Sequence, residues 1–368
     1  MLAAQQNMAP GDIRLIRIWL SILALLIVVM IIVGGATRLT DSGLSITEWA
    51  PIKGFLPPFT AEHWASEFAA YQTTDEFKYQ NSAMSLAEFK FIYWWEWGHR
   101  FLGRLIGLFI LIPMVAFWAM GKFNGWLKMA VVSLFLLICF QGFLGWWMVK
   151  SGLVDRVDVS QIRLAVHLTT AFILLAGVVW VARSLASHSR EGVPNIRWQA
   201  VGLWVLLLVQ IFIGGLVAGL DAGMAYNTWP TMNGAIVPDN LWTMTPWWQN
   251  LTDNAATVQF FHRMTAYGLW IVAALHCWSV YHRAGPSTHF RRSLALFVLV
   301  SLQALMGIVT LLLQAPLSWS LAHQLGGVIL LIFATSHWRA LAIRPQVTFQ
   351  TAAVTVNGPH VGNRSNIS

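Results

Sequence analysis

The stretch from residue 15 to residue 43, LIRIWLSILALLIVVMIIVGGATRLTDSG, decides the fold class of this chain. Its apolar run has about 20 residues, the length of helix that spans a hydrocarbon layer of ~30 Å. Similar runs recur along the sequence, and only 10% of the residues are charged, against roughly a quarter in a soluble domain. Because backbone groups in lipid must be satisfied within the segment, the runs are expected to be helices. The sequence predicts an all-α integral membrane protein.

Eight such runs predict eight transmembrane helices. Lysine and arginine gather in the connections on one side, which the positive-inside rule assigns to the cytoplasm together with both termini. The same bias accounts for the formal charge of +8, so nucleic acid is not an expected partner. The predicted spans are 15–36, 93–119, 127–149, 162–185, 200–219, 257–280, 293–314 and 318–338.

An internal repeat relates the two halves of the chain. Gly34 and Asp41 follow the first span, and Gly214 and Asp221 follow the fifth at an offset of 180 residues. Further landmarks recur in the same order, so we expect two tandem pseudo-symmetric four-helix bundles with the same orientation in the membrane. The predicted parts are a cytoplasmic N-terminus (1–14), an N-terminal bundle (15–185) with a long outer loop (37–92), a cytoplasmic linker (186–199), a C-terminal bundle (200–340) and a polar cytoplasmic tail (341–368).

Four histidines occupy matching places in the two halves. Each lies five or six residues inside the outer end of a predicted span, so at 1.5 Å per residue all four share a depth of roughly 8–9 Å. A zinc or copper site would normally add a third protein ligand, whereas two axial imidazoles in a large apolar cavity favour haem. His276 has no counterpart in the repeat and is expected to be a packing residue. The candidate iron ligands are His99 and His167 in the first half, and His262 and His323 in the second.

Arginines lie close to these histidines in the sequence. A charged group at this depth is costly and is usually paired, and a guanidinium matches the carboxylate of a haem propionate. Arg38, Arg100 and Arg263 are therefore predicted to bind propionates. Snorkelling of the side chain to the interface explains Arg104 equally well.

The two halves differ in one acidic residue. Glu96 precedes His99 by three residues and shares its helix face, whereas Gln259 stands at the equivalent place in the second half. A carboxylate at that depth suits proton transfer, although an ion pair with Arg100 or Arg104 would also explain it. The first outer loop is also the longer one. We expect an active site in the first half and an electron-relay haem in the second.

Five stretches carry a resemblance to a known family. Together they span the chain from about residue 15 to residue 340, and they resemble haem A synthase. Some members of that family carry cysteine pairs in the outer loops, whereas Ser45-Ile-Thr-Glu-Trp49 stands at the first such place here. The sequence is therefore similar to the cysteine-free subgroup of proteobacteria and mitochondria. The five stretches are 34–50, 96–101, 215–235, 261–265 and 323–328.

The resemblance implies an enzyme of the bacterial inner (plasma) membrane that oxidises a methyl group of haem O to the formyl group of haem A, with water as the oxygen source. His99 and His167 would frame the iron of the substrate haem O, and Glu96 matches the family's functional acidic residue. His262 and His323 would ligate a haem B cofactor. The implied neighbours are membrane lipid, the enzyme that makes haem O and assembly factors of cytochrome c oxidase, and a homo-oligomer is left open.

Two other classes fit parts of the pattern. A di-haem membrane cytochrome that shuttles electrons from quinol would use the four histidines but would not need Glu96 or the longer loop. A transporter of parallel repeats would be expected to show helices broken at mid-membrane, and the predicted spans show none. Chromatography of the haems extracted from cells separates the first two classes, because only the synthase yields haem A.

Overall fold

The computed structural model describes residues 8–50, 53–123, 125–153, 156–186 and 196–342. Most of the predicted tail, part of the predicted N-terminus and most of the linker lie outside these ranges. The described residues form helices and turns, and their only β-type pairing is an isolated bridge between Met232 and Ala235. The prediction of an all-α chain is confirmed.

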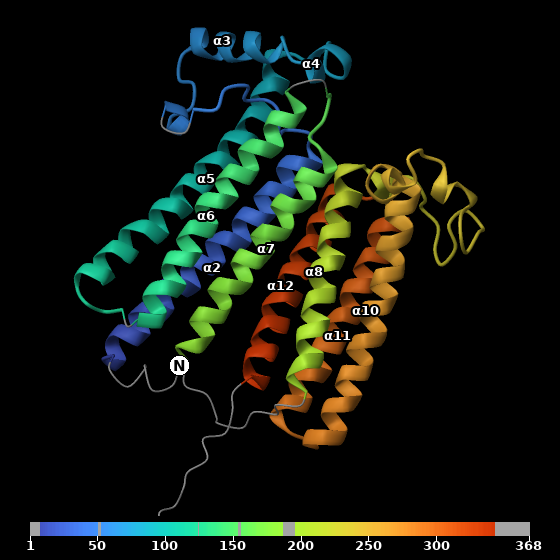
Figure 1. The fold of residues 1–368 in the computed structure, drawn as a ribbon. Coiled ribbons are helices and arrows are strands. Elements are labelled where there is room, and N and C mark those ends of the chain that lie inside the picture. The colour runs from blue at the N-terminus through green and yellow to red at the C-terminus, as the bar shows by residue number, and fades with distance from the viewer. Residues whose placement is uncertain (1–7, 51–52, 124, 154–155, 187–195, 343–368) are drawn as a thin grey trace, which may run out of the picture.

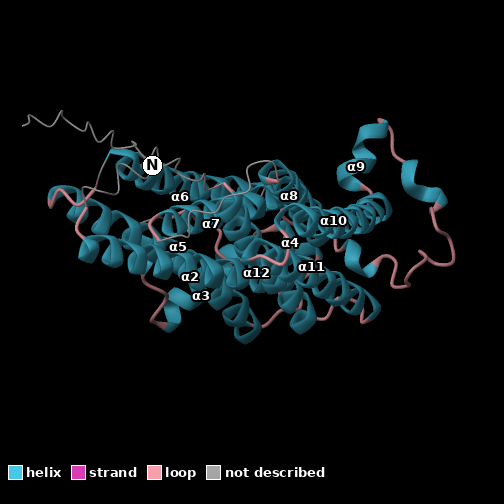
Figure 2. Ribbon diagram, turned by 90° about the horizontal axis from the view of Figure 1, so that it is seen from below, coloured by secondary structure: helices cyan, strands magenta, loops and turns pink. Residues whose placement is uncertain are grey.

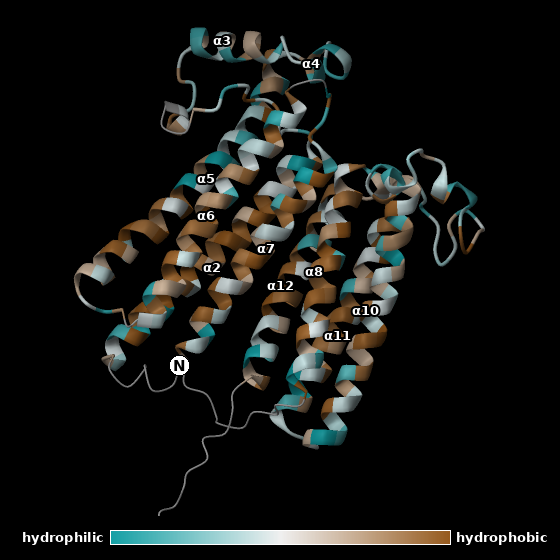
Figure 3. Cartoon of the chain, in the orientation of Figure 1, coloured by the Kyte–Doolittle hydropathy of each residue, from teal (hydrophilic) through white to brown (hydrophobic). Residues whose placement is uncertain are grey.

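Eight long helices make up the body of the described part of the chain. Seven of them are long and apolar enough to cross a membrane, so the chain is a multi-pass membrane protein. The exception is α10, whose buried face carries polar side chains, among them Gln259, Arg263 and His276. Figure 3 shows apolar residues along the middle of the helices and polar residues toward their ends. The long helices are α2 (Pro10–Leu39), α5 (Leu86–Ala119), α6 (Gly125–Gly152), α7 (Gln161–Ser184), α8 (Arg197–Gly219), α10 (Ala255–Ala284), α11 (Thr288–Leu312) and α12 (Leu317–Leu341).

The long helices lie side by side (Figures 1 and 2), and we call those of the first half (α2, α5, α6 and α7) the first group and those of the second half (α8, α10, α11 and α12) the second group. In the first group α2 packs on α5 and α7, and α6 packs on α5 and α7. In the second group α8 and α11 each pack on both α10 and α12, which repeats the same pattern. The groups meet where α7 contacts α8 and where α12 contacts α2 and α7. The start of α2 and the end of α12 lie at the same end of the molecule (Figure 1).

Apolar side chains point both inward and outward, as a protein in lipid requires. A large core cluster runs through both groups and includes Leu20, Leu175 and Leu331, none of which is exposed. Leucines and aromatic residues on the outer faces are exposed by contrast, such as Leu25 at 61% and Trp278 at 63%. A soluble fold would not leave so much apolar surface uncovered.

The first outer loop holds structure that the sequence did not predict. Helix α5 begins at Leu86, seven residues before the predicted start at 93, because Ser85 and Glu88 form a capping box there. The extension of α5 carries Phe89 and Ile92, which pack with residues of the short helices α3 (Ala61–Tyr71) and α4 (Asp75–Tyr79). These two helices cover the end of the first group that lies opposite the start of α2 (Figure 1). The loop predicted at 37–92 is therefore a small folded layer.

The second outer loop connects α8 to α10 by short turns. It contains the 3₁₀ segments η2 (Ala222–Met224), η3 (Asp239–Trp242) and η4 (Trp247–Gln249), and the four-residue helix α9 (Asn250–Asp253). Asp221 begins this loop with φ of 49°, and Asp41 follows α2 with φ of 47°. Aspartate tolerates this left-handed conformation better than most residues. The repeat seen in the sequence is thus also a repeat of backbone geometry.

Candidate functional site

Each candidate histidine lies against a glycine of the neighbouring helix. A Cβ atom added to the glycine would come within 3.2 Å of the ring for Gly34 and His99, 3.3 Å for Gly145 and His167, 3.2 Å for Gly214 and His262, and 2.9 Å for Gly307 and His323. Contacts below about 3.4 Å are tighter than ordinary van der Waals contact. The four glycines therefore make room for the four imidazoles, and the arrangement is the same in both halves.

The four histidines are only partly buried, although they lie on helices packed within the two groups. His167 lies within electrostatic range of His99, and His262 within range of His323. Neither pair forms a ring-to-ring hydrogen bond within the described part of the chain. Two imidazoles within electrostatic range of each other but without a hydrogen bond between them, each with accessible surface, suit a flat ligand held between them. The residues present fit a haem in each half.

A different histidine pair shows what close packing looks like in this molecule. His276 and His337 are 2% and 1% exposed, and their Nε2 atoms are 2.8 Å apart. His276 also lies 3.4 Å from the side-chain oxygen of Gln199. The prediction that His276 is a packing residue is confirmed, while its contact with His337 was not predicted.

Glu96 is a buried carboxylate with three partners. It is 2% exposed, and its Oε2 accepts hydrogen bonds of 2.8 Å from the Ser45 hydroxyl and from the Ile46 backbone N–H. Its Oε1 lies 2.5 Å from the Arg100 guanidinium. Arg100 also donates to the backbone carbonyls of Ile46 and Glu48. The ion pair considered as an alternative role for Glu96 is therefore present, and it joins α5 to the segment after α2.

The second half repeats this arrangement without the carboxylate. Gln259 is 3% exposed and donates to the backbone carbonyls of Ala222 and Tyr226. Arg263 donates to the Gln259 side-chain oxygen at 3.3 Å and to three backbone carbonyls. No carboxylate is among these partners. Of the three arginines predicted to bind propionates, Arg263 is thus the one held only by neutral groups.

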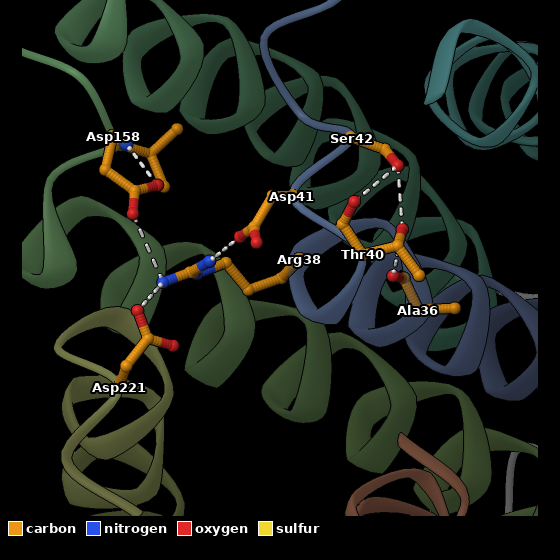
Figure 4. Close-up of polar contacts among 8 residues, drawn as sticks. Ala36, Arg38, Thr40, Asp41, Ser42, Asp158 and Asp221 are labelled. Carbon is orange, nitrogen blue, oxygen red and sulfur yellow. Dashed lines mark hydrogen bonds and ion pairs between the residues drawn. The ribbon is translucent and has the colours of Figure 1, made fainter. Parts of the chain in front are cut away.

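Arg38 lies among carboxylates at the junction of the two halves (Figure 4). It pairs with Asp41 at 2.7 Å, with Asp158 at 3.4 Å and with Asp221 at 3.0 Å. Asp41 and Asp221 are equivalent in the repeat, so a single arginine of the first half connects both copies. The predicted contact of Arg38 with a propionate stays untested, and these partners favour a role at the junction.

Two kinds of buried polar residue were not found from the sequence. Glu76 of α4 is 3% exposed, and its Oε2 has no hydrogen-bond partner among the described residues. Burial, followed by the negative charge of Glu96, raises the pKa of Glu76 to about 8. Burial also raises the pKa of its neighbour Tyr71. No sequence signal marks Glu76, because α4 lies outside the repeat.

The second kind of residue that the sequence analysis missed is a set of three glutamines, although a sequence pattern does mark them. The pattern Gln-x-x-x-Gly occurs at Gln141, Gln210 and Gln303, and each time its glycine is one that faces a candidate histidine. Each glutamine also contacts that same histidine. A search of the repeat for polar residues one turn from the glycines would have found all three.

Known proteins resemble this chain over most of its length. The model of the family described as cytochrome oxidase assembly protein matches residues 17–335. The haem A synthase of Brucella ovis is 47% identical over 331 residues, which cover 89% of this chain and 92% of the relative. The haem A synthase of Sinorhizobium fredii is 48% identical over 328 residues, 89% of each chain. The resemblance stated from the sequence is confirmed by these matches.

Proposed function

The chain belongs to the haem A synthase family, and we propose that it oxidises a methyl group of haem O to the formyl group of haem A. The balanced reaction converts the methyl group and one water into an aldehyde, four electrons and four protons. Two hydroxylations followed by loss of water from the geminal diol satisfy this balance. The product would serve cytochrome c oxidase, and enzymes that make haem O and assemble the oxidase are the proposed partners.

Two similar sites with one chemical difference carry the proposal. Both halves hold a pair of partly buried histidines against glycines, but only the first has a buried carboxylate nearby. His99 and His167 would frame haem O beside Glu96. His262 and His323 would hold haem B, with Arg263 available to a propionate. Haem B, when bound there, would supply a route for the electrons that leave the substrate.

Glu96 is the proposed acceptor of protons from the substrate site. Ser45 and Ile46 fix one carboxylate oxygen and Arg100 fixes the other, so the group is held in place. The neutral amide of Gln259 at the equivalent place cannot accept a proton in this way. This difference supports catalysis in the first half and storage of the cofactor in the second.

The proposed topology places all eight long helices in the bacterial inner membrane as two four-helix bundles, α10 included. Its polar residues Gln259, Arg263 and His276 lie on the buried face, where a membrane helix tolerates them. The charge rule puts both termini in the cytoplasm, and the start of α2 and the end of α12 do lie at one end of the molecule (Figure 1). The histidine sites would then lie toward the outer side.

Co-expression with a source of haem O tests the activity. Haems extracted from the membranes and separated by chromatography should include haem A when the chain is present and only haems O and B when it is absent. A chain that carries haem B but yields no haem A would instead fit the di-haem cytochrome that shuttles electrons from quinol.

A further inference from the structure

Three of the four candidate ligands share a second contact besides their glycine. The side-chain amide of a glutamine one turn before that glycine donates to the backbone carbonyl of the histidine. The distances are 2.7 Å from Gln141 to His167, 3.1 Å from Gln210 to His262 and 2.8 Å from Gln303 to His323. The contact joins α6 to α7, α8 to α10 and α11 to α12. It is a recurring unit, and not a single coincidence of packing.

The same three glutamines each keep an unused acceptor. The Oε1 atoms of Gln141, Gln210 and Gln303 are buried and have no hydrogen-bond partner among the described residues. The amide nitrogens of Gln210 and Gln303 lie 3.1 Å and 3.2 Å from the Nδ1 atoms of their histidines, and that of Gln210 also lies 3.2 Å from the Nε2 atom of His262. In the Gln141 unit the Nδ1 atom of His167 is itself buried and unpartnered within the described chain. In the Gln141 unit, the acceptor and the ring nitrogen are therefore both unsatisfied.

If the histidines bound iron, the Nδ1–H group of each ring would become a hydrogen-bond donor for the Oε1 atom of its glutamine. An imidazole that binds iron through Nε2 carries its hydrogen on Nδ1, and metal-bound histidines usually donate that hydrogen to an acceptor that fixes the ring and strengthens the ligand. A turn of the amide group brings Oε1 to the place where the amide nitrogen now faces the ring, and it exchanges the donation to the histidine carbonyl for a bond to the ring. A buried polar atom left without a partner is costly, and loading the site gives Oε1 a donor.

The fourth place in the pattern is different. Met30 stands four residues before Gly34, where the repeat has Gln210 before Gly214. A thioether donates no hydrogen bond and accepts only weakly. The methyl group of Met30 instead lies against Gly103, and the described residues give the His99 ring no hydrogen-bond partner. His99 is thus the one candidate ligand without an amide.

We propose that Gln141, Gln210 and Gln303 are positioning residues that fix the ligand imidazoles, and that His99, whose unit has Met30 at the place of the glutamine, is the exchangeable ligand of the substrate haem. This inference rests on the proposed function and deepens it. A resident haem needs two firm ligands, and the second half has two glutamines. A haem that enters as substrate and leaves as product needs a ligand that releases it, and the first half has one glutamine and one methionine.

The proposal is tested by replacing glutamine with methionine in the second half and methionine with glutamine at the equivalent position of the first half. Gln210→Met and Gln303→Met remove an acceptor from the second half, and Met30→Gln adds one to the first. Gln199→Met is the matched control, because Gln199 is also on α8 but contacts the non-ligand His276. The purified full-length proteins, loaded with haem B or haem O, are mixed with excess apomyoglobin, and the rate of haem transfer and the midpoint potential are measured.

We expect Gln210→Met and Gln303→Met to lose haem B about tenfold faster than wild type, the lower end of the effect of such partners on metal affinity, with a raised midpoint potential. Met30→Gln should lose haem O about tenfold more slowly. Gln199→Met should match wild type. Unchanged rates in both glutamine variants, or an equal effect of Gln199→Met, would overturn the proposal. Because transfer rates need no turnover, a chain that makes no haem A refutes the proposed function separately.

Discussion

At the scale of single residues, the two halves differ most clearly between Glu96 and Gln259. Both side chains are buried on equivalent helices, and both contact an arginine four residues later. Glu96 and its pairing with an arginine were both anticipated from the sequence, because a charge at that depth needs a partner. The fold of the segment after α2 over α5 decides which arginine pairs with Glu96. The sequence does not reveal that fold.

Replacing Glu96 by glutamine should abolish the proposed proton transfer while preserving the volume of the side chain. General base catalysis contributes about 100-fold or more, so haem A yield should fall by at least that factor at unchanged haem B content. Glu62→Gln on the exposed face of α3 is the control and should leave the yield unchanged. Chromatography of extracted haems decides, and an undiminished yield in Glu96→Gln would refute the role of Glu96.

Glu76 predicts a dependence of stability on pH. Burial raises the pKa of Glu76 from 4.5 to about 8, so between these values the native protein binds a proton that the unfolded chain releases. Stability should therefore fall as the pH rises from about 5 to 8. Glu76→Gln has no carboxyl group to titrate at this position. Its stability relative to that of wild type should therefore increase as the pH rises from about 5 to 8. Thermal unfolding at a series of pH values measures the difference, and parallel curves would contradict the assignment.

At the scale of helices, hydrophobic runs predicted most of the elements and missed those that depend on packing. The starts of α7, α8 and α12 lie within three residues of the predictions. Helix α5 begins seven residues early because its first two turns pack on α3, outside any apolar span. Helices α3 and α4 are short and polar on one side, so no long run marks them. Of the glycines that face the histidines, Gly34 and Gly214 were visible only as repeat landmarks, and Gly145 and Gly307 were not found from the sequence.

Gly307 offers a test of these helix contacts. A side chain at this position of α11 would come within 2.9 Å of the His323 ring, so Gly307→Val should displace the imidazole and lower haem B affinity by about tenfold. Gly268→Ala on α10 is the control, since nothing lies within 4 Å of the added Cβ and helix propensity improves by up to ~1 kcal/mol. Pigment content of the two purified variants gives the answer. Equal haem B in both would contradict the proposed close contact.

At the scale of the whole molecule, the internal repeat predicted two halves but not how they are joined. The halves meet through α7, α8, α12 and α2, and at the outer end through Arg38 and its three carboxylates (Figure 4). A repeat in sequence says which residues are equivalent, whereas Arg38 has no equivalent and breaks the symmetry. Its propionate role was inferred from its depth alone, because the sequence does not show that Asp158 and Asp221 come close.

Arg38→Met should therefore act on the junction rather than on haem. The carboxylates of Asp41, Asp158 and Asp221 are 39–68% exposed, so solvent screens them and the loss of stability should be about 1 kcal/mol. The melting temperature should fall slightly, and more at low salt than at high salt. Haem B content should equal that of wild type. Loss of haem B from this variant would restore the propionate role of Arg38.

The division of labour between the halves is the central claim, and the haem B content of histidine variants tests it most directly. Purified His99→Ala, His167→Ala, His262→Ala and His323→Ala proteins are compared with wild type by pigment extraction, with chromatographic behaviour as the check of folding. The account predicts that the first two keep haem B and yield no haem A, while the last two lose haem B. Full haem B in His262→Ala and His323→Ala, or its equal loss from all four variants, would contradict the claim.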